Sequence, residues 1–226
     1  MSSNQLFANR TDAGRRLAGK LKHLRGSHPL ILGLPRGGIP VAVEVANALD
    51  APLEPMFVKK IGAPGEEELA LAAVADGPNP QLVINEEIMS RLPPDSTYIR
   101  AQMDQKLEEI RHRRASYLGE RPVSDPAGRT VILVDDGIAT GSTAKAALAV
   151  IRKSNPAWLV LAVPVLPAQS LKDLQSLADE LVFLSAPMRF GSVGEHYECF
   201  QQVSDAQVID LLNQHASTGS INETGE

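Results

Sequence analysis

The chain has 226 residues, of which 43% are hydrophobic and 22% are charged, as in ordinary globular proteins. Its net charge of -5 argues against a nucleic-acid-binding protein, which normally presents a basic surface. The single cysteine, Cys199, excludes an internal disulfide and a cysteine-based metal cluster; we expect it to be a small buried residue in a protein of a reducing compartment. The polar start is no signal peptide and no apolar run is long enough to span a bilayer, so we expect a cytoplasmic protein without a membrane partner.

Apolar segments alternate with amphipathic ones along the chain. Residues 11–24 predict an amphipathic helix, because leucines recur every three or four residues between Arg and Lys. Short strands are expected at 29–34, 53–58, 131–134, 158–163 and 181–184, and helices at 39–49, 98–117, 142–154 and 168–177. This alternation predicts an α/β fold with a mainly parallel central sheet that is flanked by helices on both faces.

Two stretches depart from this alternation. Residues 61–85 combine Gly, Pro and acidic residues with two apolar runs, which indicates a long excursion after the second strand, with a hairpin as one option. Residues 217–226 have almost no apolar side chains, so we expect a disordered tail there. We expect residues 1–216 to form a single domain.

The run VILVDDGIATGST, residues 131–143, is the most informative stretch of the chain. A buried strand ends on Asp135 and Asp136, a loop of small residues follows, and an alanine-rich helix begins directly after it. Backbone N–H groups of such a loop and the helix N-terminus favour a phosphate, and the carboxylates can accept bonds from sugar hydroxyls or hold a divalent cation. The alternative is an ordinary strand–helix turn in which Asp136 or Ser142 caps the helix. The motifs of P-loop and dinucleotide-binding proteins are absent.

A second loop of the same kind follows the first strand. The sequence LPRGG at residues 34–38 has two glycines that allow a close backbone approach to a ligand, and Arg36 could bind phosphate oxygens. Taken alone, the sequence favours a plain turn with an exposed arginine. Because the carboxyl ends of parallel strands meet at one edge of a sheet, we expect this loop to lie beside residues 131–143.

Residues 131–143 resemble the signature of the type I phosphoribosyltransferases, enzymes that use phosphoribosyl pyrophosphate (PRPP). The resemblance implies that family's α/β fold, with a small hood built from residues 1–28 and 186–215 and a flexible loop at 61–85. It implies that Asp135 and Asp136 face the 2- and 3-hydroxyls of the ribose. It also implies that the 5-phosphate is held by Ala139, Thr140, Gly141, Ser142 and Thr143.

The resemblance assigns the pyrophosphate group to the other loops. Phosphoribosyltransferases have a pyrophosphate loop after their first core strand, which matches Arg36, Gly37 and Gly38. Lys59 and Lys60 end the predicted second strand and resemble an Arg-Lys pair that some members use against pyrophosphate. Adjacent lysines are as often simply solvated, and Lys59 stands where an arginine is common, which disfavours a bidentate contact there.

Two further stretches resemble the mobile loop and the acceptor-binding segment of phosphoribosyltransferases. Residues 61–85 resemble its mobile catalytic loop, in which Glu66, Glu67 and Glu68 are acid/base candidates, Glu68 being preferred. Taken together, the motifs LPRGG, VKKIGAP, VDDGIATGST and FGSVGEHYECF resemble a subgroup of phosphoribosyltransferase-like proteins whose acceptor is undefined. Residues 68–76 depart from the pattern of this subgroup, in which a glycine is expected among the alanines. In the stretch 190–200, Phe190, His196 and Tyr197 are candidates for contacts with the acceptor by ring stacking, or alternatively for core packing.

The function implied by the resemblance is Mg²⁺-dependent transfer of the phosphoribosyl group of PRPP to a nitrogen acceptor, such as a nucleobase or related heterocycle, with release of pyrophosphate. Asp135 and Asp136 would be the catalytic carboxylates and would orient Mg²⁺, mainly indirectly. Alternatives are a PRPP- or nucleotide-binding regulator with little or no catalysis, and a hydrolase of another sugar phosphate. Members of this family often form homodimers, so the resemblance also implies a homodimer for this chain. The sequence does not indicate which surface would form the interface.

Overall fold

A computed structural model describes residues 5–75, 80–91 and 94–222. The strands are β1 (Leu30–Gly33), β2 (Leu53–Pro55), β3 (Lys59–Ala63), β4 (Glu66–Ala75), β5 (Gln81–Ile84), β6 (Thr130–Val134), β7 (Trp158–Val165) and β8 (Glu180–Ser185). The helices are α1 (Arg10–Leu21), α2 (Gly38–Leu49), α3 (Glu86–Arg91), α4 (Ser96–Leu118), α5 (Ser142–Lys153), α6 (Leu171–Gln175) and α7 (Asp205–Asn222). Short 3-10 turns are η1 (Lys22–Ser27), η2 (Ala168–Ser170) and η3 (Val193–His196).

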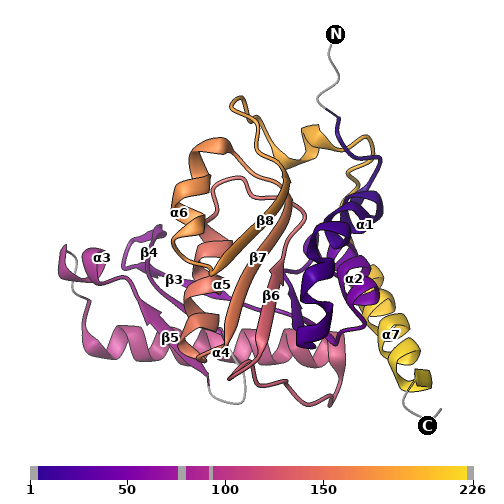
Figure 1. The fold of residues 1–226 in the computed structure, drawn as a ribbon. Helices are drawn as coiled ribbons and strands as arrows, with labels where there is room; N and C mark the ends of the chain where they lie inside the picture. The colour runs from indigo at the N-terminus through magenta and orange to yellow at the C-terminus, as the bar shows by residue number, and fades with distance from the viewer. Residues whose placement is uncertain (1–4, 76–79, 92–93, 223–226) are drawn as a thin grey trace.

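Five strands form a parallel sheet in the order β2-β1-β6-β7-β8. Helices α1, α2 and α7 lie on one side of this sheet, and α5 and α6 lie on the other (Figure 1). The α/β fold with a parallel sheet between helices, predicted from the alternation of apolar segments, is confirmed.

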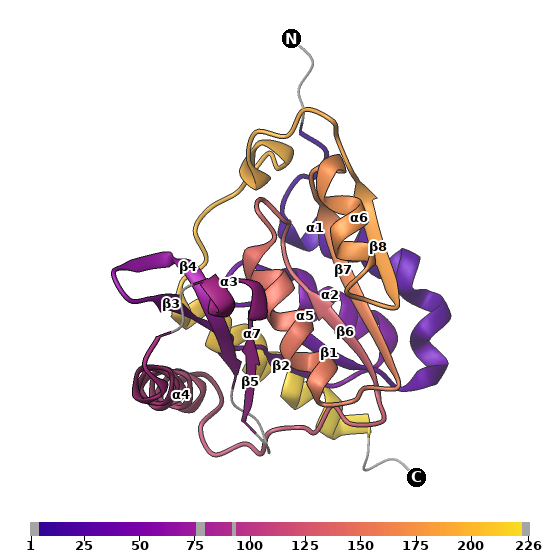
Figure 2. The same cartoon turned by 90° about the vertical axis from the view of Figure 1, so that its left-hand side faces the viewer.

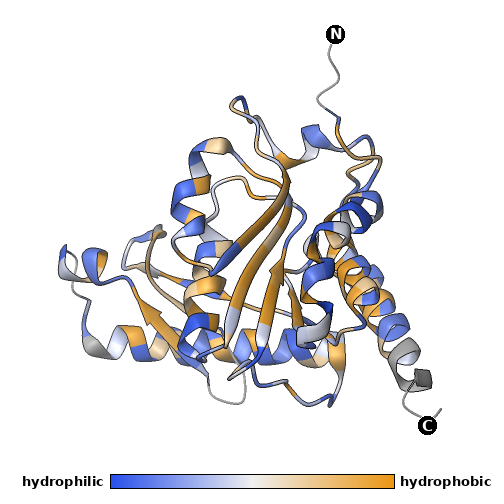
Figure 3. Cartoon of the chain, viewed as in Figure 1, coloured by the Kyte–Doolittle hydropathy of each residue, from blue (hydrophilic) through white to orange (hydrophobic). Residues whose placement is uncertain are grey.

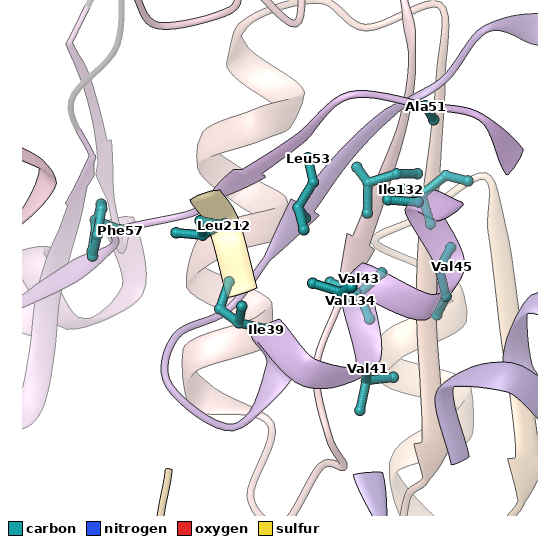
Figure 4. Close-up of a cluster of buried hydrophobic side chains, with 14 of the residues drawn as sticks. Ile39, Val41, Val43, Val45, Ala51, Leu53, Phe57, Ile132, Val134 and Leu212 are labelled. Atoms are coloured by element: carbon teal, nitrogen blue, oxygen red, sulfur yellow. The ribbon is translucent and has the colours of Figure 1, made fainter. Parts of the chain in front are cut away.

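The apolar strands are continuous hydrophobic runs because both faces of the sheet are buried. On β6, Ile132 and Val134 pack into one core cluster with residues of α2 and with Leu212 of α7 (Figure 4). The alternate residues Val131 and Leu133 face the second cluster, under α5. Colouring by hydropathy shows the central strands as the most apolar part of the fold, with polar residues on the outer faces of the helices (Figure 3). Each buried Val, Ile or Leu contributes about 1.5–3 kcal/mol to this packing.

A second, antiparallel sheet in the order β3-β4-β5 occupies the segment predicted as an excursion. The dipeptide Pro64-Gly65 makes the turn between β3 and β4, and Gly65 has the positive φ of 81° that a turn of this kind requires. The small sheet contacts α5 on one side and α4 on the other (Figure 2). The hairpin option is therefore correct, whereas the mobility of residues 61–85 stays a prediction.

Three boundaries differ from the sequence prediction. The second strand ends at Pro55 rather than at residue 58, and Lys59 and Lys60 begin β3. The expected helix 168–177 is divided into η2 and α6. Helix α7 continues through residues 217–222, where disorder was predicted, because an established helix is extended by one bond per residue, and Ser217 Oγ also donates to the Asn213 carbonyl. Residues 223–226 lie outside the described part of the chain.

Candidate active site

The loops after β1 and β6 meet at the carboxyl edge of the parallel sheet. The register pairs Gly33 with Val134, and the Leu34 N–H donates to the Val134 carbonyl at 2.8 Å. The residues that follow, Pro35–Gly37 and Asp135–Gly141, therefore start side by side. The Pro35-Arg36 peptide bond is cis. The predicted juxtaposition of the two glycine-rich loops is thus present.

The two carboxylates after β6 are half-buried. Asp135 Oδ1 accepts a bond from the Asp136 N–H at 2.9 Å, which orients its side chain. Burial, together with the negative charge of Asp136, raises the pKa of Asp135 well above its usual value. Burial also raises the pKa of Asp136, although the positive charge of Arg10 opposes this shift. The pair is therefore less readily ionised than two solvated carboxylates.

Arg10, the first residue of α1, holds the second carboxylate. Its Nε lies 2.7 Å from Asp136 Oδ2, and both side chains are nearly buried, at 12% and 13% exposure. From the other side of the loop, the Tyr197 hydroxyl donates to the Asp136 carbonyl. Burial raises the pKa of Tyr197, and the charge of Asp136 adds to the shift, so the hydroxyl stays protonated and remains a donor.

The glycines of the β1 loop make room for the acidic pair. A Cβ at Gly37 would lie 2.1 Å from Asp136 Oδ2, and one at Gly38 would lie 2.9 Å from the Val134 carbonyl oxygen. The Gly38 N–H donates to the Leu34 carbonyl at 2.9 Å. The sequence predicts that these two glycines allow a ligand to approach their backbone closely. In the structure, the residues that lie this close to them belong to the β6 loop. A contact of Gly37 or Gly38 with pyrophosphate remains a prediction.

The loop before α5 is mostly exposed and leads directly into a helix N-terminus. Gly141 is buried and has a positive φ of 76°, a backbone conformation that favours glycine. Helix α5 begins at the next residue, so its first N–H groups have no intrahelical partner. The remaining predicted members, Ala139, Thr140, Ser142 and Thr143, are exposed. These residues can therefore contact an anion without rearrangement of the core.

The two lysines of β3 point to different neighbours. Lys60 Nζ lies 3.5 Å from Ser142 Oγ, at the phosphate loop. Lys59 Nζ pairs with Glu109 of α4 at 3.3 Å, and this contact contributes to a lowered pKa of Glu109, after the hydrogen bond from Lys106. A contact of Lys59 or Lys60 with pyrophosphate stays a prediction. Successive strand residues face opposite sides, so the two ammonium groups diverge.

Arg36 is half-exposed in the loop after β1. It precedes Gly37, which lies against Asp136, so the arginine is at the same edge of the sheet as the acidic pair. Glu66 is exposed at the β3–β4 turn. The side chains of Glu67 and Glu68 lie outside the described part of the structure, so the acid/base assignment of Glu68 stays a prediction.

The aromatic residues of the predicted hood have three different environments. Tyr197 is 2% exposed and packs on Phe7 at 5.2 Å between ring centroids, so its ring supports the site from within and is not available to stack on an acceptor. His196 is buried against Phe190. Phe190 is half-buried, and its contact with an acceptor remains a prediction. Cys199 is exposed, contrary to expectation, because the segment after Tyr197 runs along the surface beside Ala8.

The donor set fits a cation that is shared with a ligand. Within the described ranges, no three His, Cys, Asp or Glu side chains gather where they could hold a metal ion. Asp135 and Asp136 supply two carboxylates, one of which is already paired with Arg10. Mg²⁺ is commonly bound by one or two carboxylates together with substrate phosphates, so these residues fit an ion that arrives with a phosphorylated ligand.

Arg10 was missed by the sequence reasoning. It lies 126 residues from Asp136 along the chain, and a basic residue at the start of an amphipathic helix gives no signal of such a contact. The only related expectation was that the first 28 residues contribute to the hood.

Among the described residues, no helix is long and apolar enough to cross a membrane.

Comparison with known proteins shows the family of the chain. Residues 2–197 match the model of the phosphoribosyl transferase domain family. The chain is 40% identical over 210 residues to "Putative phosphoribosyl transferase MT0597" of Mycobacterium tuberculosis (strain CDC 1551 / Oshkosh), covering 93% of this chain and 47% of that protein. The same values hold for "Putative phosphoribosyl transferase Rv0571c" of strain H37Rv. The chain thus spans about half the length of the curated relatives it matches.

A solved structure gives the same assignment of the fold. The crystal structure of TT1426 from Thermus thermophilus superposes with a TM-score of 0.82 at 39% sequence identity, covering 92% of this chain and 98% of that one. The fold and the family match define a phosphoribosyltransferase-like α/β protein. The chain belongs to the phosphoribosyl transferase domain family.

Proposed function

We propose that the protein binds PRPP and transfers its 5-phosphoribosyl group to a nitrogen acceptor, with release of pyrophosphate. The observation that carries the proposal is the arrangement after β6, where a half-buried acidic pair is followed directly by an exposed loop at a helix N-terminus. A ribose 5-phosphate group needs these two environments close together, because its ring hydroxyls and its terminal phosphate are separated by only a few bonds.

In the proposed complex, the ligand would extend along the carboxyl edge of the sheet. The 5-phosphate would lie on the N–H groups at the start of α5, with Lys60 adding a positive charge from β3. The ribose hydroxyls would face Asp135 and Asp136. The pyrophosphate would then lie toward the β1 loop, where the sequence prediction assigns Arg36 to it.

The reaction would exchange one bond at C1 of the ribose. The C1–O bond to pyrophosphate breaks and its electron pair leaves with the oxygen, while the acceptor nitrogen forms the C1–N bond and gives up a proton to solvent or to a base. The protein's part is to orient the two reactants and to stabilise the charge of the leaving group. Mg²⁺, when bound with the substrate, supplies further charge neutralisation on the pyrophosphate oxygens.

The first test combines binding with turnover. Isothermal titration with PRPP and Mg²⁺ should show binding, and a panel of nucleobases and related heterocycles should include one that releases pyrophosphate. The double variant Asp135→Asn with Asp136→Asn should lose that release. Asp104→Asn, which changes an exposed carboxylate of α4, serves as the matched control and should behave as the unchanged protein.

Each outcome separates the candidate functions. Unchanged turnover in the double variant would contradict the assigned roles of the carboxylates. Binding without pyrophosphate release from any acceptor would favour a PRPP-binding regulator. Release of ribose 5-phosphate in the absence of an acceptor would favour a hydrolase.

A further inference from the structure

The acidic pair is connected to two distant segments of the chain through one arginine. Residues 6–8 lie against residues 196–199: the Glu198 N–H donates to the Phe7 carbonyl at 2.8 Å, and the Cys199 N–H donates to the Ala8 carbonyl at 3.0 Å. These segments are seen together above the sheet in Figure 1. Arg10 follows directly and extends from this pair of segments toward the β6 loop.

The Arg10 guanidinium is held by three different groups. Its Nε donates to Asp136 Oδ2 at 2.7 Å, and its Nη1 donates to the Gln201 carbonyl at 2.7 Å. Its Cζ lies 3.8 Å from the centroid of the Phe200 ring, a cation–π contact. Below it, the Asn9 side chain caps α1 by accepting from the Asp12 N–H. A side chain restrained in this way gives its partner carboxylate a defined direction.

The carboxylate is restrained on its other side as well. Oδ2 is confined between Arg10 and the backbone of Gly37, since a Cβ on Gly37 would be only 2.1 Å from it. The second oxygen, Oδ1, is farther from that position, at 3.2 Å. Arg10 and Gly37 together therefore fix which of the two oxygens is turned toward the β1 loop.

We propose that Arg10 is a positioning residue of the ribose end of the site, which fixes Asp136 by its Oδ2 so that Oδ1 meets a ribose hydroxyl. The proposal rests on the proposed binding of PRPP. An enclosed ion pair stabilises a fold little more than an apolar pair in its place would, because desolvation of both charges offsets their attraction, although separating the two charges is costly. The main effect of Arg10 is therefore to orient the Asp136 carboxylate. Because this carboxylate would face the ribose, loss of Arg10 should weaken binding of the ribose and not of the pyrophosphate.

The test compares two ligands that differ in the ribose. Isothermal titration with PRPP and with inorganic pyrophosphate, each with Mg²⁺, is carried out on the unchanged protein, Arg10→Gln, Arg10→Lys and Arg15→Gln. Arg10→Gln should weaken PRPP binding by at least tenfold, about 1.4 kcal/mol, and should change pyrophosphate binding less than twofold. Arg10→Lys, which keeps the charge, should recover part of the loss.

Arg15→Gln is the matched control. Arg15 lies on the same helix and pairs with Glu44 at 3.0 Å, but its side chain is 71% exposed. It should bind both ligands as the unchanged protein does. A thermal melt of each variant shows whether it is folded. If Arg10→Gln is not folded, the ratio of the PRPP and pyrophosphate affinities of Arg10→Lys decides. A selective loss of PRPP affinity supports the proposal, and a ratio equal to that of the unchanged protein overturns it.

The failures are distinguishable. If the unchanged protein binds PRPP and Arg10→Gln binds it equally well, or loses both ligands to the same degree, the positioning role is wrong while the proposed function stands. If the unchanged protein does not bind PRPP, the proposed function fails, and the role of Arg10 fails with it.

Discussion

Replacing Gly37 by Ala tests whether the close approach of the β1 and β6 loops determines the position of Asp136. Gly37 has φ -63° and ψ -32°, so an alanine would be accommodated by the backbone without strain. The obstacle is steric, because its Cβ would lie 2.1 Å from Asp136 Oδ2 and 2.7 Å from Cγ. Either the carboxylate or the loop must move by about 1 Å to restore an ordinary contact.

The magnitude follows from what this movement breaks. Displacing the carboxylate breaks its 2.7 Å bond to Arg10, a charge-assisted contact between nearly buried groups. A hydrogen bond to a charged group is worth about 1.5–3 kcal/mol. Gly→Ala at a permissive backbone position stabilises by about 0.4–1 kcal/mol through the unfolded state. We therefore expect Gly37→Ala to lower the free energy of unfolding by about 1–2.5 kcal/mol, and to weaken PRPP binding.

The assay is urea denaturation with Gly19→Ala as the control. Gly19 lies within α1, and a Cβ there would have nothing within 4 Å, so Gly19→Ala should raise the free energy of unfolding by up to about 1 kcal/mol. If Gly37→Ala is stabilised to the same degree and binds PRPP as before, the steric reasoning about Asp136 is refuted.

Two further predictions concern charged groups. Lys60→Gln should weaken PRPP binding by about fivefold or more at low salt, because Lys60 contacts Ser142 of the loop before α5. Lys59→Gln should change PRPP binding less than twofold, because Lys59 pairs with Glu109. Equal effects of the two variants in titration calorimetry would contradict this difference. The pKa of Asp179 is lowered chiefly by its hydrogen bonds from Arg152, both at 3.0 Å. The stability from this ion pair is present above the unfolded-state pKa of about 3.9 and is lost as pH falls through the lower folded-state pKa. The difference in unfolding free energy between the unchanged protein and Asp179→Asn should therefore shrink as the pH falls from about 6 to about 3. A difference that is constant over this range would show that the ion pair does not stabilise the fold.

The sheet and the position of the site were predictable because they depend on local patterns. The apolar run of β6 followed by Asp135 and Asp136 indicates a buried strand with its ligand edge at the carboxyl end, and the structure has this arrangement. Successive buried strands leave little freedom for the order of loops at that edge. The family resemblance rested on the same residues.

The remaining parts depend on contacts between distant residues. The divergence of Lys59 and Lys60 follows from the start of β3 at Lys59, which the sequence placed at the end of the preceding strand. The burial of Tyr197 and the exposure of Cys199 depend on where residues 6–8 lie. No periodicity in either segment carries that information, because packing of separate segments decides it.

The contact of Arg10 with Gln201 bridges 191 positions of the sequence, and the contact with Asp136 bridges 126. Contacts of such long range form late in folding, because closing a long loop costs entropy before any contact offsets it. During synthesis, the sheet from β1 to β8 can therefore be complete while Phe200 and Gln201 are still inside the ribosome and Arg10 lacks two of its three partners. The ribose end of the site would then mature together with the packing of α7, whose Val208 and Leu212 complete the core on that side of the sheet. A partly made chain would therefore have its sheet before it could bind its ligand tightly.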